Sequence, residues 1–158
     1  MNTVAAYFRQ IPRAVLVAVA AAVGLAALLR HRLTRFDADT EAKLAQLHPA
    51  ARAKFRAFLE AARERGWQVI FVSGLRTYAQ QAALHAANPA NAATPGHSSH
   101  ETGEAGDLNF IHTRTGEELR KGTAKSRWQA SGLVYDATAA GLTWGGVFGD
   151  NNHFSARS

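Results

Sequence analysis

The stretch "WQVIFVSGLRT", residues 67–77, constrains the fold more than any other part of the chain. Its first six residues are mostly apolar, β-branched or aromatic, and such a short run is typical of a buried strand. Ser73-Gly74 then turns the chain, and Arg76 follows the end of the strand. We therefore expect a buried strand that ends in either a surface arginine or one that projects into a cleft.

Helical periodicity lies on both sides of this strand, and Asp37, Asp39 or Thr40 can cap the first helix. The predicted helices cover residues 40–47, 49–65, 77–87 and 126–140, and further strands are predicted near residues 105–111, 142–145 and 152–154. Pro49 suits a first helical turn, and Gly66 suits a left-handed C-terminal cap. Because helices and strands mix without regular βαβ alternation, the pattern predicts one α+β domain over residues 37–158.

Residues 1–36 differ from the rest of the chain in composition. The run "AVLVAVAAAVGLAALL", residues 14–29, has no polar side chain, and arginines flank it on both sides. A retained membrane anchor is the favoured interpretation, although a helix of 16 residues spans only about 24 Å and alanine is weakly hydrophobic. A signal peptide cleaved at a small-x-small site and a buried core helix are the alternatives. The flanking arginines leave the membrane orientation open.

The charge distribution argues against a nucleic-acid partner. The whole chain carries a net charge of +6, but five arginines and no acid lie within residues 1–36. The remaining 13 basic and 12 acidic residues leave only +1 for residues 37–158. We therefore expect no nucleic-acid binding by the folded part, which lacks a basic stripe.

A second informative stretch is "GHSSHETGEAGD", residues 96–107. His100 and Asp107 stand seven residues apart, an odd offset that would place them on opposite faces of a continuous strand. A bend at Gly103 between them would bring both side chains to one point. The chain has no cysteine, so a metal site here would need nitrogen and oxygen ligands.

The missing partner occurs near the end of the chain, in "GDNNHF", residues 149–154. Together with His100 and Asp107, His153 would complete a two-histidine, one-carboxylate set that leaves a position for water, as in catalytic zinc sites. Asp150 would then be a free carboxylate suited to act as general base. A helical HExxH site is excluded because Glu104 occupies the position of its second histidine. Serine catalysis through Ser98 or Ser99 is disfavoured because no G-x-S-x-G motif is present.

Three blocks of the sequence, in order, resemble the zinc peptidases of the D-alanyl-D-alanine carboxypeptidase and L-alanyl-D-glutamate endopeptidase type. The matching residues are Ser73, Gly74, Arg76, Gln81 and Leu84; then Pro95, Gly96, Ser98, His100, Gly103, Ala105 and Asp107; and finally Trp144, Gly145, Gly146, Asp150, His153 and Phe154. The resemblance implies a small α+β domain of the hedgehog / D-Ala-D-Ala peptidase type, with helices flanking a central antiparallel sheet. It also implies hydrolysis of peptidoglycan stem peptides with one zinc ion.

The resemblance assigns roles to individual residues. His100, Asp107 and His153 would hold zinc, Asp150 would activate water and pass its proton to the leaving amine, and Arg76 would hold the oxyanion. Ser98 and Gln81 would contact the substrate or support the site. The aspartate at position 150 favours the endopeptidase, because members that cut D-Ala-D-Ala tend to carry glutamate there. The D,D-carboxypeptidase of the same family is the alternative.

Four positions depart from the family pattern: Leu75 replaces a tyrosine, Gly106 an apolar residue, Asn152 a proline and Ser155 a glutamate. These departures bear on pocket shape and substrate preference more than on metal binding. Because peptidoglycan lies outside the cytoplasmic membrane, we expect the enzyme domain to face the periplasm or cell wall, held by the N-terminal helix at the inner membrane or released from it. Two rival hypotheses are a non-catalytic, membrane-tethered wall-binding module and a small membrane protein whose His/Asp cluster is incidental.

Overall fold

The computed structural model describes residues 15, 17–22 and 36–156. The chain divides into two compact units, Met1–Phe36 and Asp37–Ser158. In the first unit, residues 17–22 are helical. Within the described part of the chain, no helix is long and apolar enough to span a membrane. Most of the segment for which a membrane helix was predicted, residues 14–29, lies outside the described residues, so the structure gives that prediction no support.

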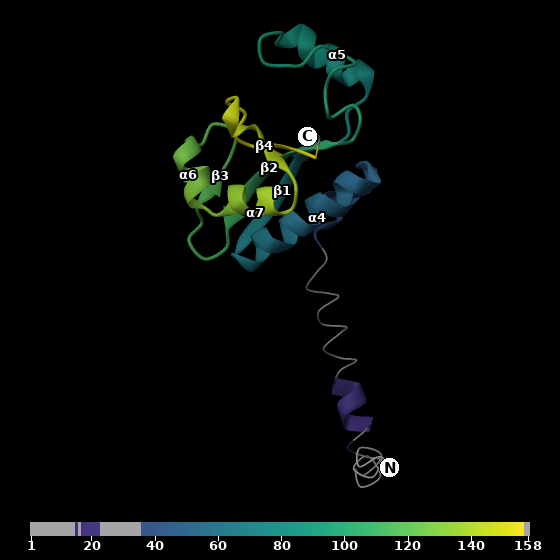
Figure 1. The fold of residues 1–158 in the computed structure, drawn as a ribbon, viewed down its shortest axis with the longest axis vertical. Coiled ribbons are helices and arrows are strands. Elements are labelled where there is room, and N and C mark those ends of the chain that lie inside the picture. The colour runs from purple at the N-terminus through teal and green to yellow at the C-terminus, as the bar shows by residue number, and fades with distance from the viewer. Residues whose placement is uncertain (1–14, 16, 23–35, 157–158) are drawn as a thin grey trace, which may run out of the picture. The chain divides into compact units, whose positions relative to one another are not determined.

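The second unit contains several helices and one antiparallel sheet (Figure 1). This combination confirms the predicted α+β class. The strands are β1 (Trp67–Ser73), β2 (Ala105–His112), β3 (Glu118–Leu119), β4 (Thr143–Trp144) and β5 (His153–Ser155). The sheet has the order β1-β2-β5-β4, and β3 also pairs with β2. All of these pairings are antiparallel. The long central strand β2 therefore brings the middle of the chain next to its C-terminal segment.

The helices are α3 (Ala38–Gln46), α4 (Pro49–Glu64), α5 (Tyr78–Ala87), α6 (Lys125–Ala130) and α7 (Leu133–Ala139), with a 3-10 turn at Gly145–Val147. Asp37 caps α3 by accepting a hydrogen bond of 2.9 Å from the Thr40 amide. Gly66 ends α4 in a left-handed conformation, with φ of +88°, as its position predicts. Figure 1 shows α5 and its adjoining loops at one end of the sheet, apart from α4, α6 and α7.

The hydrophobic core lies between α4 and one face of the sheet. Phe55 and Phe58 of α4 are fully buried, and their rings contact Phe71 of β1, Phe110 of β2 and Phe154 of β5. Side chains alternate between the two faces of a strand, so the residues between these core positions point to the opposite face. Asp107 and His153 are both of this second kind, which places them on the face of the sheet away from the aromatic core.

Two sequence-based expectations about the C-terminal half were wrong in detail. The predicted helix over residues 126–140 is two helices, α6 and α7, because Ser131 and Gly132 separate them and Gly132 has a φ of +81°. The short strand β3 was not predicted, since two residues are too few to show alternation. Neither difference affects the strands that carry the candidate ligands.

Candidate metal centre

Two of the three predicted ligands face each other across neighbouring strands. Asp107 of β2 and His153 of β5 are direct partners in the antiparallel register. Directly opposed residues have Cβ atoms about 4.5–5.5 Å apart, so their side chains meet without any special turn. Here the His153 Nδ1 atom lies 3.1 Å from the Asp107 Oδ1 atom. The register of the sheet therefore builds two thirds of the ligand set.

The third predicted ligand, His100, arrives from the loop before β2. Gly103 has a φ of +69°, and its amide donates to the His100 carbonyl at 3.2 Å, which provides the bend expected between His100 and Asp107. A side chain at Gly103 would also approach the His48 backbone nitrogen at 2.9 Å, so glycine suits this position for two reasons. The bend turns the imidazole of His100 over the open face of the sheet, where it is 4% exposed.

A backbone carbonyl determines which nitrogen of His100 is available for a metal. The Nδ1 atom lies 2.8 Å from the Gly74 carbonyl oxygen, which can only accept a hydrogen bond. Nδ1 therefore carries a proton, and Nε2, which faces His153 and Asp107, is the nitrogen left for a metal. Metal-binding histidines commonly have their second nitrogen fixed in this way.

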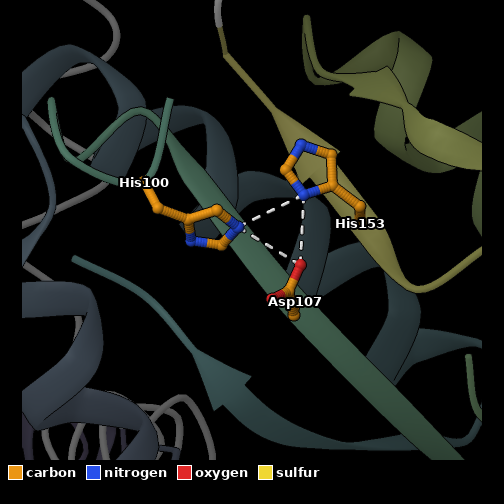
Figure 2. A group of neighbouring side chains, drawn as sticks. All are labelled: His100, Asp107 and His153. Atoms are coloured by element: carbon orange, nitrogen blue, oxygen red, sulfur yellow. Dashed lines mark hydrogen bonds and ion pairs between the residues drawn. The ribbon is translucent and has the colours of Figure 1, made fainter. Parts of the chain in front are cut away.

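The spacing of the three donor atoms fits a zinc ion. Figure 2 shows the side chains of His100, Asp107 and His153 converging on one point. The His100 Nε2 atom lies 3.3 Å from both the Asp107 Oδ1 and the His153 Nδ1 atoms, and the third separation is 3.1 Å. Tetrahedral zinc with bonds of about 2.0–2.1 Å places its ligands roughly 3.3 Å apart. Nitrogen and carboxylate donors at this spacing suit zinc, with the fourth position left for water or substrate.

The surroundings of Asp107 keep its carboxylate ionised. Burial on its own would raise the pKa of Asp107, but hydrogen bonds and opposite charge from His100 and His153 outweigh it and hold the pKa well below the usual range. The other carboxylate oxygen, Oδ2, lies 3.5 Å from Nη2 of Arg76. A charged, oriented carboxylate is the form that binds a metal.

Arg76 is held at the edge of the centre by two polar side chains. Its guanidinium donates to the Gln81 amide oxygen at 2.7 Å and to the Ser73 hydroxyl at 3.0 Å. Gln81 is 1% exposed, and its amide nitrogen donates to the Ala93 carbonyl at 2.6 Å. Both ends of the Gln81 side chain are thus occupied, so of its two predicted roles the geometry suits support of the site, through Arg76, better than contact with substrate.

The loop that carries Ser98 is braced by an acid that the sequence reasoning missed. Ser98 is mostly buried, and its hydroxyl accepts a hydrogen bond of 3.3 Å from the His100 amide. The carboxylate of Glu101 accepts hydrogen bonds from the amides of Gly96 and Ser98 at 2.9 and 3.2 Å. Glu101 lies three residues after Ser98, and this spacing could have predicted that its carboxylate bonds back to the amides of the turn.

A cleft of about 280 Å³ opens over the three ligands. It is lined by Arg76, Gln81, Leu84, Asn91, Ala92, Ala93, His97, Ser98, Ser99, His100, Asp107, Lys121, Phe148, Asp150 and His153. Asp150, the predicted base, therefore shares this cleft with the ligands. Its two carboxylate oxygens each lie 3.2 Å from the ammonium nitrogen of Lys121. Lys121 was not singled out from the sequence, because no motif surrounds it.

Close packing explains two features of the sequence. A side chain at Gly145 would meet the Asp150 carbonyl at 2.6 Å, and one at Gly146 would meet the Trp144 ring at 2.2 Å, so this W-G-G segment has no room for Cβ atoms. A side chain at Gly106, one of the departures from the family pattern, would meet the ring of Phe71 at 2.8 Å. Here a large aromatic ring of β1 fills the space that an apolar side chain on β2 would occupy.

Comparisons with known proteins agree with this architecture. The family model of VanY, D-alanyl-D-alanine carboxypeptidase, matches residues 44–136, more than half of the chain. Among solved structures, the Serratia marcescens L-Ala D-Glu endopeptidase ChiX is similar with a TM-score of 0.58 and 23% identity, over 77% of this chain and 88% of that one.

Two further solved structures share the fold. VanYB in complex with D-Alanine-D-Alanine gives a TM-score of 0.51 and 18% identity, over 69% of this chain and 70% of that one. The structure of the LdcB LD-carboxypeptidase gives a TM-score of 0.50 and 22% sequence identity, over 69% of this chain and 58% of that one. A comparison with curated protein sequences finds no match.

The family match ends before Asp150 and His153, so the placement of these two residues rests on the structure alone. The sheet register and the cleft bring both of them to the residues that the match covers, His100 and Asp107. The chain belongs to the VanY D-alanyl-D-alanine carboxypeptidase family and is a zinc peptidoglycan peptidase, as the three sequence blocks predict.

Proposed function

We propose that the protein hydrolyses the L-alanyl-D-glutamate bond of peptidoglycan stem peptides as an endopeptidase. One observation supports hydrolysis. A single cleft contains the His100-Asp107-His153 set, the separate carboxylate of Asp150 and the cation of Arg76. These are the groups that metal-assisted hydrolysis of an amide requires.

Each group has a definite task in this reaction. A bound zinc ion supplies Lewis acidity, which polarises the peptide carbonyl and makes water acidic enough to lose a proton near neutral pH. The carboxylate of Asp150 takes that proton and later delivers it to the nitrogen of the leaving amine. Arg76 faces the negative charge that develops on the carbonyl oxygen, and Gln81 and Ser73 keep its guanidinium in place.

The choice of bond rests on the type of residue at position 150. Asp150 is an aspartate, and by resemblance this favours the endopeptidase over the D,D-carboxypeptidase, in which glutamate is usual. The family name favours the carboxypeptidase, which remains the alternative. The solved structures do not decide, since both kinds of enzyme share this fold at low identity.

Mass spectrometry of digested peptidoglycan tests the proposal directly. The zinc-loaded full-length protein is incubated with muropeptides, with and without a chelator. An endopeptidase leaves a new amino terminus on D-glutamate, whereas a carboxypeptidase releases free D-alanine. If zinc is bound but neither product forms, the proposed hydrolysis fails, and binding to sacculi then tests the rival hypothesis of a wall-binding module. If no zinc is bound, the His/Asp cluster is incidental.

We further propose that the peptidase domain acts outside the cytoplasmic membrane and that residues 1–36 tether it there or later release it. This is supported by the substrate's location and by the apolar run with flanking arginines. A reporter that is active only in the periplasm, fused after Ser158, should give signal. A silent reporter with normal expression would contradict the exported topology.

A further inference from the structure

Lys121 places a second cation in the cleft, beside the predicted base. Its ammonium nitrogen lies 3.2 Å from each carboxylate oxygen of Asp150. The side chain is nonetheless 64% exposed, and an ammonium group has three N–H donors. Lys121 can therefore contact a ligand in the cleft while it stays near Asp150.

The position of Lys121 is built by hydrogen bonds from the segment that carries Asp150. The loop around Lys121 is closed by mutual bonds of 2.9 Å between Arg120 and Thr123. The Thr123 carbonyl accepts a bond of 2.8 Å from the side chain of Asn151, whose own carbonyl accepts one of 2.7 Å from Trp144. Because Asn151 adjoins Asp150, these bonds fix the lysine loop against the predicted base.

A second hollow of about 380 Å³ continues the cleft past Lys121. It is lined by Ala90, Asn91, Ala92, Ala93, Lys121, Phe148, Gly149 and Asp150. Lys121, Phe148 and Asp150 line both hollows, so they stand where the two meet. Phe148 is 66% exposed and offers an apolar wall there. A peptide that enters the metal centre from this direction passes Lys121.

The charges in the cleft favour an anionic group at this point. Asp107 and Asp150 balance Arg76 and Lys121, so a divalent ion with neutral histidine ligands gives the cleft an excess of positive charge. The guanidinium of Arg76 already donates to Gln81 and to Ser73. Lys121 is consequently the cation that is most available to a substrate.

We infer that Lys121 binds the α-carboxylate of the residue whose amine leaves when the bond is cut. This role rests on the proposed function, in which Asp150 protonates that amine. The α-carboxylate is attached to the same carbon as the amine, so a group beside Asp150 is placed to reach it. In D-Ala-D-Ala the carboxylate is the peptide's C-terminus. In stem peptides D-glutamate continues through its side-chain carboxyl, so its α-carboxylate is also free unless amidated.

Matched substrates test this specificity role. Each peptide, one with an internal L-Ala-D-Glu bond and one ending in D-Ala-D-Ala, is made with the relevant α-carboxylate free and as the amide. For the cleaved peptide, Lys121→Gln should lower kcat/KM about 10- to 100-fold on the free form and much less on the amide. The ratio of kcat/KM on the free form to kcat/KM on the amide cancels any effect of the substitution on Asp150, because both forms meet the same base. The pair that shows the loss identifies the source of the carboxylate.

Two variants serve as controls. Lys121→Arg keeps the charge and should retain the preference for the free carboxylate. Arg114→Gln removes one exposed charge from the turn after β2, outside both hollows, and should leave both rates unchanged. Zinc content and melting temperature are measured for every variant. If Lys121→Gln keeps its zinc content and melting temperature and still prefers the free carboxylate as strongly as the unmodified protein, the assignment of Lys121 is overturned.

A binding measurement separates this inference from the proposed function. The zinc-loaded protein is titrated with two uncleavable pairs, D-alanine against D-alaninamide and D-glutamate against D-isoglutamine, and binding is followed by NMR. The unmodified protein should prefer the acid of at least one pair, and Lys121→Gln should lose that preference. If no peptide is cut, the proposed function fails, while this result still decides the role of Lys121. Equal binding of acid and amide by the unmodified protein would overturn that role.

Discussion

Gly106 provides a quantitative test of how β2 is packed, because the residue lies beside the ligand Asp107. A Cβ atom at Gly106 would lie 2.8 Å from the tip of the Phe71 ring and 3.0 Å from the Phe55 ring. The φ of Gly106 is not in the left-handed region, so its backbone conformation is open to alanine. Steric conflict with the two rings is therefore the main cost of Gly106→Ala.

Two opposing effects determine how much Gly106→Ala changes the free energy of unfolding. Replacing glycine by alanine restricts the unfolded chain and stabilises the native state by about 0.4–1 kcal/mol. Overpacking a well-filled core costs about 1–3 kcal/mol. Phe55 and Phe71 are 0% and 1% exposed, so neither ring can relieve the contact by turning into solvent. The steric cost prevails, and we expect Gly106→Ala to lower the free energy of unfolding by about 1–2 kcal/mol.

Urea unfolding followed by tryptophan fluorescence measures this difference by linear extrapolation. Gly122→Ala is the matched control, because its Cβ atom would meet nothing within 4 Å, and it should be neutral or slightly stabilising. In the background of Phe71→Leu, the cost of Gly106→Ala should shrink by at least about 0.5 kcal/mol, because the shorter side chain leaves room. A loss below about 0.5 kcal/mol, or full additivity of the two substitutions, would refute this account of the packing.

Three further predictions concern the site and the first helix. Asp150→Asn should keep bound zinc by metal analysis but lower turnover about 100-fold or more, since the base is lost and the ligands remain. His100→Ala should lose zinc, whereas His97→Ala, from the same cleft but outside the ligand set, should retain it. Asp37→Ala should lower the free energy of unfolding at neutral pH by about 0.5–1 kcal/mol. Hydrogen bonds from Thr40 lower the pKa of Asp37, so its contribution is present above the unfolded pKa of about 3.9 and is lost as the pH falls through the lower folded value. The difference in melting temperature should consequently disappear in strong acid, and a constant difference would contradict this origin.

Local patterns were sufficient to predict the longer strands and to single out His100 and Asp107 as candidate ligands. The apolar run that forms β1 needed no tertiary information, since its residue types and length exclude most alternatives. The odd offset between His100 and Asp107 required a bend, and Gly103 between them was the predicted place for it. His153 was proposed as the third ligand from its residue type, and the resemblance gave it the same role, but spacing alone does not reveal that its strand pairs with β2.

Features that depend on long-range packing could not be predicted in this way. Lys121 lies next to Asp150 in a region where a hydrogen bond joins Asn151 to Thr123, residues that are 28 positions apart. The departure at Gly106 became understandable once its neighbour across the sheet was known to be a phenylalanine. A single sequence carries both contacts, but neither leaves a local pattern, so only the fold exposes them.

The way in which the backbone holds the three candidate ligands predicts how the protein responds to loss of its metal. β2 and β5 hold Asp107 and His153 through backbone pairing, and Gly74 holds His100, so none of these supports requires an ion. The aromatic core lies on the other face of the sheet. We therefore expect a chelator to abolish turnover while near-ultraviolet circular dichroism and cooperative unfolding persist.

Zinc should then stabilise the fold only through binding linkage, by about 2.7 kcal/mol at a free concentration one hundred times its Kd. Returning zinc should restore both the melting temperature and the turnover. This behaviour contrasts with small zinc domains, in which the metal supplies most of the folding free energy and the metal-free chain is unfolded. If chelation removed the near-ultraviolet signal, the ligands would be organised by the ion, and the claim that the sheet builds the site in advance would be wrong.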